Sequence, residues 1–364
     1  MKTHHRLFFT DSRSMGMVAD QSIDLVVTSP PYPMIEMWDS TFSDMDHRIG
    51  TCLEKGRGWE AYRRMHAVLD SVWQEVCRVL KPGGFACINI GDAVRTIGDS
   101  FFLYPNHATI LESFVQNGLC PLPAIIWRKQ TNAPNKFMGS GMLPAGAYVT
   151  LEHEYILIFR KGGKREFPTP EQRENRQQSA IFWEERNRWF SDVWFELKGA
   201  RQHMTDEKIR RRSGAYPFEL PYRLVNMYSV MGDTVLDPFA GVCTTMFAAM
   251  AACRNSVMIE IEPDFLFAAE HKAGGIKGIA NTVVDGRILG HMEFARSRAS
   301  EGRPLKYTNE HYGFPVMTRQ ETRLKILPVQ RVRRPEKAVF EVDYTGPVLP
   351  EMHVQQSLFE NEGK

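Results

Sequence analysis

The segments VVTSPPY (residues 26–32) and VLDPFAGVCTT (residues 235–245) decide the fold, because each places polar residues directly after a buried-type strand. Residues 23–28, IDLVVT, form an apolar, β-branched run that is typical of a strand buried on both faces, and the prolines that follow end it. Residues 234–236 form a second short strand, which stops at Asp237-Pro238. In an open parallel sheet, ligands bind at the carboxyl ends of strands, so both segments are expected on one functional edge.

The pattern around these segments alternates between strands and helices. Strands are expected at residues 6–10, 85–90, 123–127, 154–159 and 256–261, and amphipathic helices at 59–80, 105–117, 217–229 and 244–252. A turn is expected at Lys81-Pro82-Gly83-Gly84, and an irregular loop at 129–148. Beyond about Gly286 the chain is basic and rich in proline, with few clear elements expected. Alternation of this kind predicts an α/β fold with a mostly parallel sheet.

Composition is that of a globular chain of 364 residues, with 43% hydrophobic and 24% charged residues and a mean hydropathy of −0.34. No apolar run approaches the roughly 18 to 20 residues that cross a bilayer, and residues 1–15 lack the apolar core of a signal peptide. We therefore expect a cytoplasmic protein with no membrane association. The six cysteines are scattered, with no metal-binding spacing, so no metal site is expected.

The second segment has the ingredients of a nucleotide-type pocket. Asp237 closes a strand, Gly241 permits close approach of the backbone, and Thr244 begins a helix. About twenty residues later the strand VMIEIE ends in Glu260 and Glu262, where an acid can bind ribose hydroxyls. A dinucleotide-binding oxidoreductase, or simply a tight turn, would share these features, although no GxGxxG follows the first strand.

The first segment is harder to explain by packing alone. Two prolines fix the backbone and leave the carbonyls of Ser29 and Pro30 as acceptors, while Tyr32 supplies an aromatic face. Such a set suits the exocyclic amino group of a base, because accepting both of its protons favours a tetrahedral nitrogen with a directed lone pair. The alternative is a polyproline II docking site, which is expected in an exposed linker rather than at the end of a buried strand.

These motifs resemble those of the amino-methylating DNA methyltransferases that use S-adenosylmethionine, in the permuted order called the β class. TSPPY (28–32) is similar to the catalytic motif, LDPFAG (236–241) to the cofactor loop, and IEIEPDF (259–265) to the ribose-binding strand end. Weaker similarities lie at FFTDS (8–12), at residues 78–92, and at AYPFELPYRLVNMYS (215–229). The resemblance implies a Rossmann-like methyltransferase fold with about seven strands, helices on both faces and an inserted target-recognition module.

The resemblance also implies roles for individual residues. Catalytic roles fall to Ser29, Pro30, Pro31 and Tyr32, and contacts with S-adenosylmethionine fall to Asp11, Thr28, Phe218, Asp237, Pro238, Phe239, Gly241, Thr244 and Glu260. Glu260 is preferred over Glu262 because the family's acid aligns with it. One departure concerns the loop, where Gly241-Val242-Cys243 replaces the family's common Gly-Ser-Gly. At Cys243 the sequence therefore lacks the second glycine that would let the backbone approach the cofactor closely.

Positive charge gathers locally, although the net charge is only +2. Residues 160–212 contain 14 Lys or Arg against 9 Asp or Glu, interleaved with aromatic residues. Alone, this stretch would suit a solvated, salt-bridged surface. It occupies the place of the family's target-recognition segment, so Lys161, Lys164, Arg165, Arg210, Arg211 and Arg212 are expected to contact double-stranded DNA.

The expected organisation has four parts. They are a catalytic part (1–160), a target-recognition module (161–214), a cofactor-binding part (215–286) and a basic C-terminal extension (287–364). No Pro-Cys pair is present for covalent attack on a cytosine ring carbon. The sequence therefore predicts direct methylation of a flipped-out base, with cytosine N4 favoured by Ser29 and adenine N6 as the alternative. A cognate restriction endonuclease is a further expected partner, and a catalytically silent DNA-binding regulator is the competing hypothesis.

Overall fold

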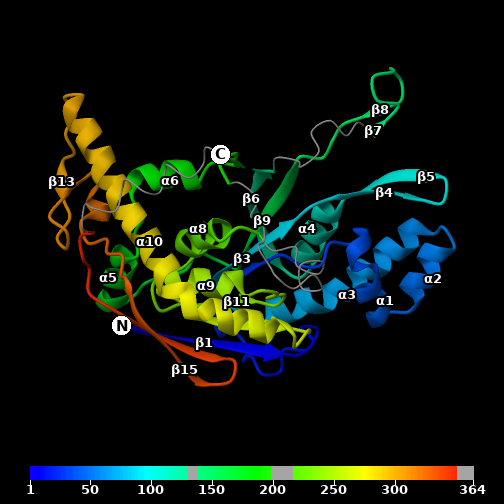
Figure 1. Cartoon of the computed structure of the whole chain (residues 1–364), viewed down its shortest axis with the longest axis horizontal. Coiled ribbons are helices and arrows are strands. Elements are labelled where there is room, and N and C mark those ends of the chain that lie inside the picture. The colour runs from blue at the N-terminus through cyan, green and yellow to red at the C-terminus, as the bar shows by residue number, and fades with distance from the viewer. Residues whose placement is uncertain (130–137, 198–215, 351–364) are drawn as a thin grey trace.

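A single large sheet forms the centre of the protein. The computed structural model describes residues 1–129, 138–197 and 216–350. Ten strands pair in the order β10-β6-β9-β3-β2-β11-β12-β1-β16-β15 (Figure 1). Their bounds are β1 Lys2–Phe9, β2 Ile23–Thr28, β3 Leu80–Ile90, β6 Leu119–Arg128, β9 His153–Lys161, β10 Val193–Trp194, β11 Thr234–Asp237, β12 Asn255–Glu260, β15 Val329–Glu336 and β16 Val339–Tyr344. Short hairpins are formed by β4 Ala93–Ile97 with β5 Ser100–Tyr104, β7 Met138–Gly139 with β8 Ala147–Tyr148, and β13 Tyr307–Thr308 with β14 Pro315–Val316.

Helices cover both faces of this sheet. Their bounds are α1 Asp39–Met45, α2 Arg48–Glu54, α3 Gly58–Val79, α4 Asn106–Gln116, α5 Pro170–Gln178, α6 Trp183–Trp189, α8 Glu219–Tyr228, α9 Thr244–Ala251 and α10 Phe265–Ser300, with 3-10 turns η1 Glu36–Trp38 and η2 Arg319–Glu321. Strand β2 shows why two layers form: Leu25 and Val27 pack with α8 and α9, whereas Val26 packs on the other face with α3. Every residue of β2 is buried, as its uninterrupted apolar run predicted.

The expected fold class is confirmed, and the sheet is larger than the seven strands expected. Strands β3, β2, β11, β12 and β1 are parallel neighbours. Beyond β1, the antiparallel strands β16 and β15 extend the sheet, and β10 adds to β6 at the other edge. In β16 buried residues alternate with partly exposed ones, as in a strand that covers one face of a core.

The expectation of few elements beyond about Gly286 is wrong for the described residues. Helix α10 runs for 36 residues and crosses that point. Its buried positions, from Ala269 through Ala280 to Ala295, recur every three or four residues and form one continuous stripe that is apolar except at His291. Tertiary packing of this stripe outweighs the low helix propensity of the glycines in the segment.

The turn expected at Lys81–Gly84 is instead an irregularity within β3. Pairing with β2 jumps from Ile23–Leu80 to Leu25–Phe85, so the four residues bulge out of the ladder. Gly83 has a φ of +80°, which glycine adopts without steric cost. The chain therefore stays in the same strand while it passes the bulge.

Parallel pairing of β2 with β11 brings the two defining segments together. Val235 lies opposite Leu25, and Leu236 lies opposite Val26. The next residues along both strands reach the same edge, where Ser29 and Asp237 follow. The expectation that these two residues lie at neighbouring strand ends is confirmed.

The opposite edge of the sheet is held by basic residues that were expected to contact DNA. The guanidinium of Arg165 donates to both carboxylate oxygens of Asp233, at 2.6 and 2.9 Å, and lies 3.7 Å from Asp24. The ammonium of Lys161 donates to two backbone carbonyls where α3 joins β3. Asp24 and Asp233 lie at the amino ends of β2 and β11, so these cations tie together the edge remote from Ser29.

We predict that Arg165→Met lowers the free energy of unfolding by about 1 to 3 kcal/mol, because the buried carboxylate of Asp233 loses its charged donors. Urea denaturation measures this change. Lys164→Met is the matched control, since Lys164 is exposed and its loss should leave stability nearly unchanged. Equal stability of Arg165→Met and the wild type would contradict a clamping role for Arg165.

Candidate active site

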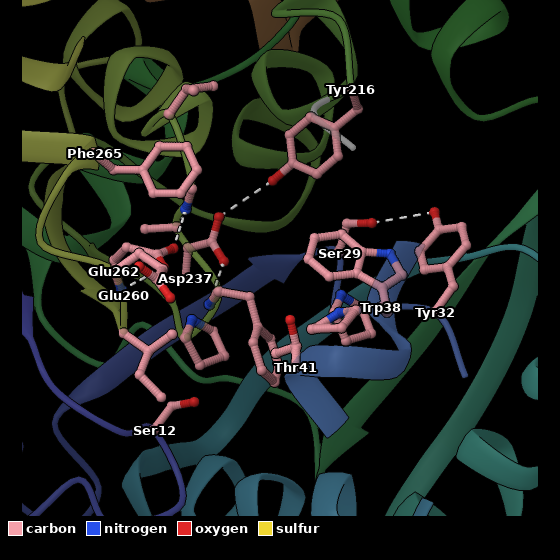
Figure 2. A pocket seen from close by; sticks show the side chains of 18 of the residues that line it. Ser12, Ser29, Tyr32, Trp38, Thr41, Tyr216, Asp237, Glu260, Glu262 and Phe265 are labelled. Carbon is pink, nitrogen blue, oxygen red and sulfur yellow. Dashed lines mark hydrogen bonds between the residues drawn. The ribbon is translucent and has the colours of Figure 1, made fainter. Parts of the chain in front are cut away.

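A cavity of about 290 Å³ opens at the carboxyl edge of the parallel strands. Figure 2 shows Glu260, Glu262, Ser12 and Phe265 at one end, Ser29, Tyr32 and Trp38 at the other, and Asp237 between them. Of the residues expected from the sequence, those that line the cavity are Asp11, Ser29, Pro30, Pro31, Tyr32, Asp237, Pro238, Phe239, Gly241, Thr244 and Glu260. The structure therefore gathers residues from distant parts of the chain into one pocket with two ends.

Asp237 joins the two strands that form the middle of the pocket. Its carboxylate accepts hydrogen bonds from Thr28 Oγ1 at 2.5 Å and from Thr245 Oγ1 at 2.6 Å. The backbone N–H of Phe239 adds a third donor at 3.0 Å, which shapes the turn after β11. Burial raises the pKa of Asp237, and these donors partly offset the rise. Thr28 thus lies behind the pocket and acts on it through Asp237.

Glu260 holds the loop that follows β11. Its carboxylate accepts from the backbone N–H of Gly241 at 2.7 Å and from that of Glu262 at 3.0 Å. Burial raises the pKa of Glu260, and the backbone donors oppose that rise. A carboxylate has about four lone-pair directions, so two backbone bonds leave capacity for further donors. Glu260 can therefore order the loop and still bind hydroxyl groups of a ligand.

The loop itself explains the departure at Cys243. Gly241 and Cys243 both have left-handed backbones, with φ of +49° and +62°, and Cys243 is the N-cap of α9. Glycine adopts this conformation freely, whereas another residue costs about 1 to 2 kcal/mol. Cys243 is fully buried, so its side chain packs into the core and does not fill the pocket. The close backbone turn survives without the second glycine.

At the other end of the pocket, Ser29 and Tyr32 are linked by their hydroxyls. Ser29 Oγ donates to the Tyr32 hydroxyl at 3.1 Å (Figure 2). Among the described residues, no donor reaches the carbonyl oxygen of Pro30, which stays available as an acceptor. The segment thus presents the carbonyl, hydroxyl and aromatic ring that its sequence indicated.

Behind Tyr32 lies a polar group to which no role was given from the sequence. The Tyr32 hydroxyl donates to Glu154 Oε2 at 2.9 Å, and Asn89 Nδ2 donates to both groups, at 2.8 and 2.7 Å. Lys129 pairs with the other oxygen of Glu154 at 2.5 Å. Glu154 and Lys129 also line the cavity. The one feature of the sequence that could have pointed to Glu154 is its place as an acid at the start of a largely apolar strand.

The middle of the pocket differs from expectation at Phe218. That ring stacks on Tyr222, 5.6 Å away, and does not line the cavity. Tyr216, two residues earlier, lines it instead and donates to Asp237 Oδ2 at 3.3 Å. Tyr216 also shares a short hydrogen bond with Thr245. The segment expected at the pocket does reach it, but through Tyr216 and not Phe218, because the start of α8 could not be fixed to one position from the sequence.

Asp11 adds a further carboxylate to the lining of the cavity. Burial alone would raise its pKa, but hydrogen bonds from the side chain and backbone of Arg13 hold the pKa below its ordinary value. Asp11 therefore stays ionised while it lines the pocket. The segments η1 and α1 supply Trp38 and Thr41 to the same cavity, from a stretch that carried no motif.

The arginine-rich segment is more deeply built into the fold than expected. Phe182, Trp189 and Trp194 are buried and pack in the core, where they cannot reach a base. Helix α6 is tied to α10 by Glu185 and Arg287, whose side chains pair at 2.6 Å. Lys164 is exposed, and Arg210, Arg211 and Arg212 lie outside the described residues. The geometry gives Lys161 and Arg165 structural partners, so we do not propose these two residues as DNA contacts.

In residues 1–129, 138–197 and 216–350, no cluster of three or more His, Cys, Asp or Glu side chains could hold a metal ion. None of the helices described there is long and apolar enough to cross a membrane.

Known proteins share this sequence pattern. Residues 23–271 match the family model described as DNA methylase. The type II methyltransferase M.MthZI of Methanothermobacter thermautotrophicus is 50% identical over 94% of this chain and 96% of its own length. M.MjaI, a type II methyltransferase of Methanocaldococcus jannaschii, is 47% identical over 75% of this chain and 92% of its own.

Solved structures share the fold. TTHA0409 of Thermus thermophilus, in complex with S-adenosyl-L-methionine, is 32% identical with a TM-score of 0.57, over 74% of this chain and 92% of that chain. The cytosine-N4-specific PvuII DNA methyltransferase has a TM-score of 0.50 at 16% identity, over 77% of this chain and 92% of that chain. At that identity the second similarity concerns the fold alone.

Proposed function

Because this chain belongs to the DNA methylase family, we propose that it methylates the N4 amino group of a cytosine flipped out of duplex DNA. The observation that carries the proposal is the single pocket in which the Ser29–Tyr32 end faces the Glu260 end across Asp237. A methyl donor and an amino acceptor bound at these two ends would meet near Asp237. That arrangement needs no covalent bond between the protein and the base.

The methyl donor is S-adenosylmethionine, and the pocket residues fit its parts. We assign the ribose hydroxyls to Glu260, whose carboxylate keeps acceptor capacity, and the adenine end to the side of Asp11 and Phe239. Tyr216 takes the place beside the methionine end that was expected of Phe218. When bound, the cofactor would supply the methyl group of its sulfonium: as the N–CH3 bond formed, the electrons of the S–CH3 bond would stay on sulfur, and the proton lost from the nitrogen would pass to solvent.

The residues of the first segment prepare the amino nitrogen for attack. Its lone pair is delocalised into the ring, which makes it a weak nucleophile. The carbonyl of Pro30 and the hydroxyl oxygen of Ser29 can each accept a hydrogen bond from one N–H of the amino group, which favours a tetrahedral nitrogen. The ring of Tyr32 stacks on the flipped base and holds it against these acceptors.

Cytosine is favoured over adenine by Ser29. In the family that the motifs resemble, serine at this position is commoner among cytosine-N4 enzymes, and aspartate among adenine-N6 enzymes. Adenine N6 is the alternative, because the same acceptors would serve its amino group. Flipping is part of either proposal, since the amino group is otherwise buried in the base pair.

The relatives suggest a biological setting. M.MthZI and M.MjaI are named type II methyltransferases, and we extend a restriction–modification role to this chain as part of the proposal. A cognate restriction endonuclease is the partner expected in that setting. Double-stranded DNA is the substrate.

Nucleoside mass spectrometry tests the proposed product directly. Unmethylated genomic DNA, incubated with the protein and S-adenosylmethionine and then digested, should contain N4-methylcytosine. N6-methyladenine instead would establish the alternative, and absence of any methylated base from active, cofactor-binding protein would contradict the proposal.

For the cofactor end, we predict that Glu260→Gln weakens S-adenosylmethionine binding by about 1 to 3 kcal/mol, because charged hydrogen bonds to the ribose are lost. Isothermal titration calorimetry measures the affinity. Glu262→Gln leaves the carboxylate of Glu260 intact and should weaken binding less. Unchanged affinity for Glu260→Gln would remove this residue from the cofactor site.

For the acceptor end, Ser29→Ala should slow methyl transfer by roughly 100- to 1000-fold while cofactor affinity stays nearly unchanged, since the hydroxyl acts mainly in the transition state. Single-turnover assays with excess protein measure the step. Ser22→Ala is the control, because Ser22 lies before the amino end of the same strand and bonds a local carbonyl. A Ser29→Ala rate equal to that of the wild type would show that the amino-group mechanism is wrong.

A further inference from the structure

Three strands converge on Tyr32 from the side away from the cofactor end. Asn89 lies near the carboxyl end of β3, Glu154 near the start of β9, and Lys129 just after β6. Register places Glu154 opposite Trp127 on β6, so Lys129 emerges beside it. Both Asn89 and Glu154 are buried, with exposed fractions of 2% and 9%. Burial of a carboxylate at this depth needs compensating partners, and Asn89, Lys129 and Tyr32 supply them.

Close packing fixes Tyr32 against Glu154. A Cβ added to Gly91 would lie 3.0 Å from Tyr32 Cε2 and 3.3 Å from Glu154 Cγ. Any larger residue at this position would press the two side chains out of place. Gly91 therefore allows the hydroxyl of Tyr32 to meet the carboxylate of Glu154.

The donors and acceptors in this group determine where each proton points. A carboxylate only accepts, so the proton of the Tyr32 hydroxyl is directed to Glu154. The Tyr32 oxygen then accepts from Asn89 Nδ2 and from Ser29 Oγ. Burial, followed by the charge of Glu154, raises the pKa of Tyr32 well above its ordinary value, so its proton stays in place. The proton of Ser29 points to the Tyr32 hydroxyl, and the lone pairs of the Ser29 oxygen remain for another donor.

We propose that Glu154 is a positioning residue for methyl transfer, which acts through Tyr32 to keep Ser29 as a hydrogen-bond acceptor toward the target amino group. This inference rests on the proposed function and names a residue that its motif does not contain. Without the carboxylate of Glu154, the Ser29 hydroxyl could turn its proton toward the amino nitrogen. It would then bind the lone pair that has to attack the methyl group. Lys129 and Asn89 serve the same end by holding Glu154.

Replacing Glu154 by glutamine should release the chain of hydrogen bonds. The amide NH2 of a glutamine cannot face the ammonium of Lys129, because both groups are donors. The amide oxygen would therefore face Lys129, and the NH2 would face Tyr32 and Asn89. Asn89 Nδ2 donates to this position, so the Asn89 amide would have to turn and present its Oδ1, which has no partner among the described residues. The proton of Tyr32 would no longer be fixed by a carboxylate, and Ser29 could turn its own proton into the pocket.

The experiment compares Glu154→Gln, Tyr32→Phe and Ser29→Ala, and each of the first two combined with Ser29→Ala. Unmethylated genomic DNA and tritiated S-adenosylmethionine serve as substrates in single-turnover assays, with cofactor affinity and thermal unfolding measured for every protein. Glu154→Gln and Tyr32→Phe should each slow transfer by roughly 10- to 100-fold, less than the loss of a direct transition-state contact. In the Ser29→Ala background neither change should slow the reaction further, because the group through which both act is gone.

Tyr32→Phe keeps the aromatic ring and the carboxylate, so it tests the chain even if Glu154→Gln is poorly folded. Glu152→Gln is the matched control, since Glu152 pairs with Arg128 at the surface and should leave the rate unchanged. A wild-type rate for Glu154→Gln would overturn the inference. The inference would also be overturned if Glu154→Gln and Tyr32→Phe slowed transfer as much in the Ser29→Ala protein as in the protein that keeps Ser29. Failure of the proposed function is distinct, because the wild type would then transfer no methyl group to DNA.

Discussion

The parallel pairing of β2 with β11 is the constraint on which the site depends. It sets the proline-ended strand beside the aspartate-ended one, and Thr28 Oγ1 bonds Asp237 Oδ1 across the junction at 2.5 Å. Because both strands are buried, a shift by one residue would turn their apolar side chains to the wrong faces. The hydrophobic core thus fixes the register, and the register fixes the distance between the two ends of the pocket.

Stability and chemistry are separated along these strands. At the amino ends, Arg165 bridges Asp24 and Asp233 and secures β2 to β11. At the carboxyl end of β11, Asp237 is buried with a raised pKa and is held by hydroxyl and backbone donors, and Glu260 at the end of the neighbouring strand β12 is held by backbone donors. Arg165 secures the amino ends of β2 and β11 and Asp237 lines the pocket at the carboxyl end, so the same pair of strands serves both purposes.

Local sequence was sufficient for the fold class and for one half of the site. Strand β2 is an apolar run with a clear stop, and the residues that follow it carry chemistry that packing does not explain. An acid at the cofactor end was also accessible, because a strand ends in Glu260 and Glu262 about twenty residues after the loop, and the family resemblance selected Glu260. Helix α10 was missed because its glycines lower helix propensity, although the spacing of its small apolar residues indicated a buried face.

The other half of the site depends on contacts between distant residues. Glu154 lies 122 residues from Tyr32 in the chain, and the pairing of β3 with β2 on one side and with β9 on the other brings them together. The aromatic residues interleaved with charge in residues 160–212 were placed in a DNA-contacting segment, yet Phe182, Trp189 and Trp194 are buried. Charge and aromatic content describe an exposed face and a packed one equally well. Tyr216 and Phe218 could not be distinguished without the exact start of α8.

In the proposed reaction, Ser29 and the carbonyl of Pro30 receive the amino group of a flipped base while the methyl donor lies toward Glu260. A crystal structure of the protein with S-adenosylhomocysteine and a duplex that it methylates would test this arrangement. We predict an extrahelical base stacked on Tyr32, with its amino nitrogen within hydrogen-bonding distance of Ser29 Oγ and the Pro30 carbonyl oxygen. An amino nitrogen held by other groups, or a base that remains stacked in the duplex of an active complex, would contradict it.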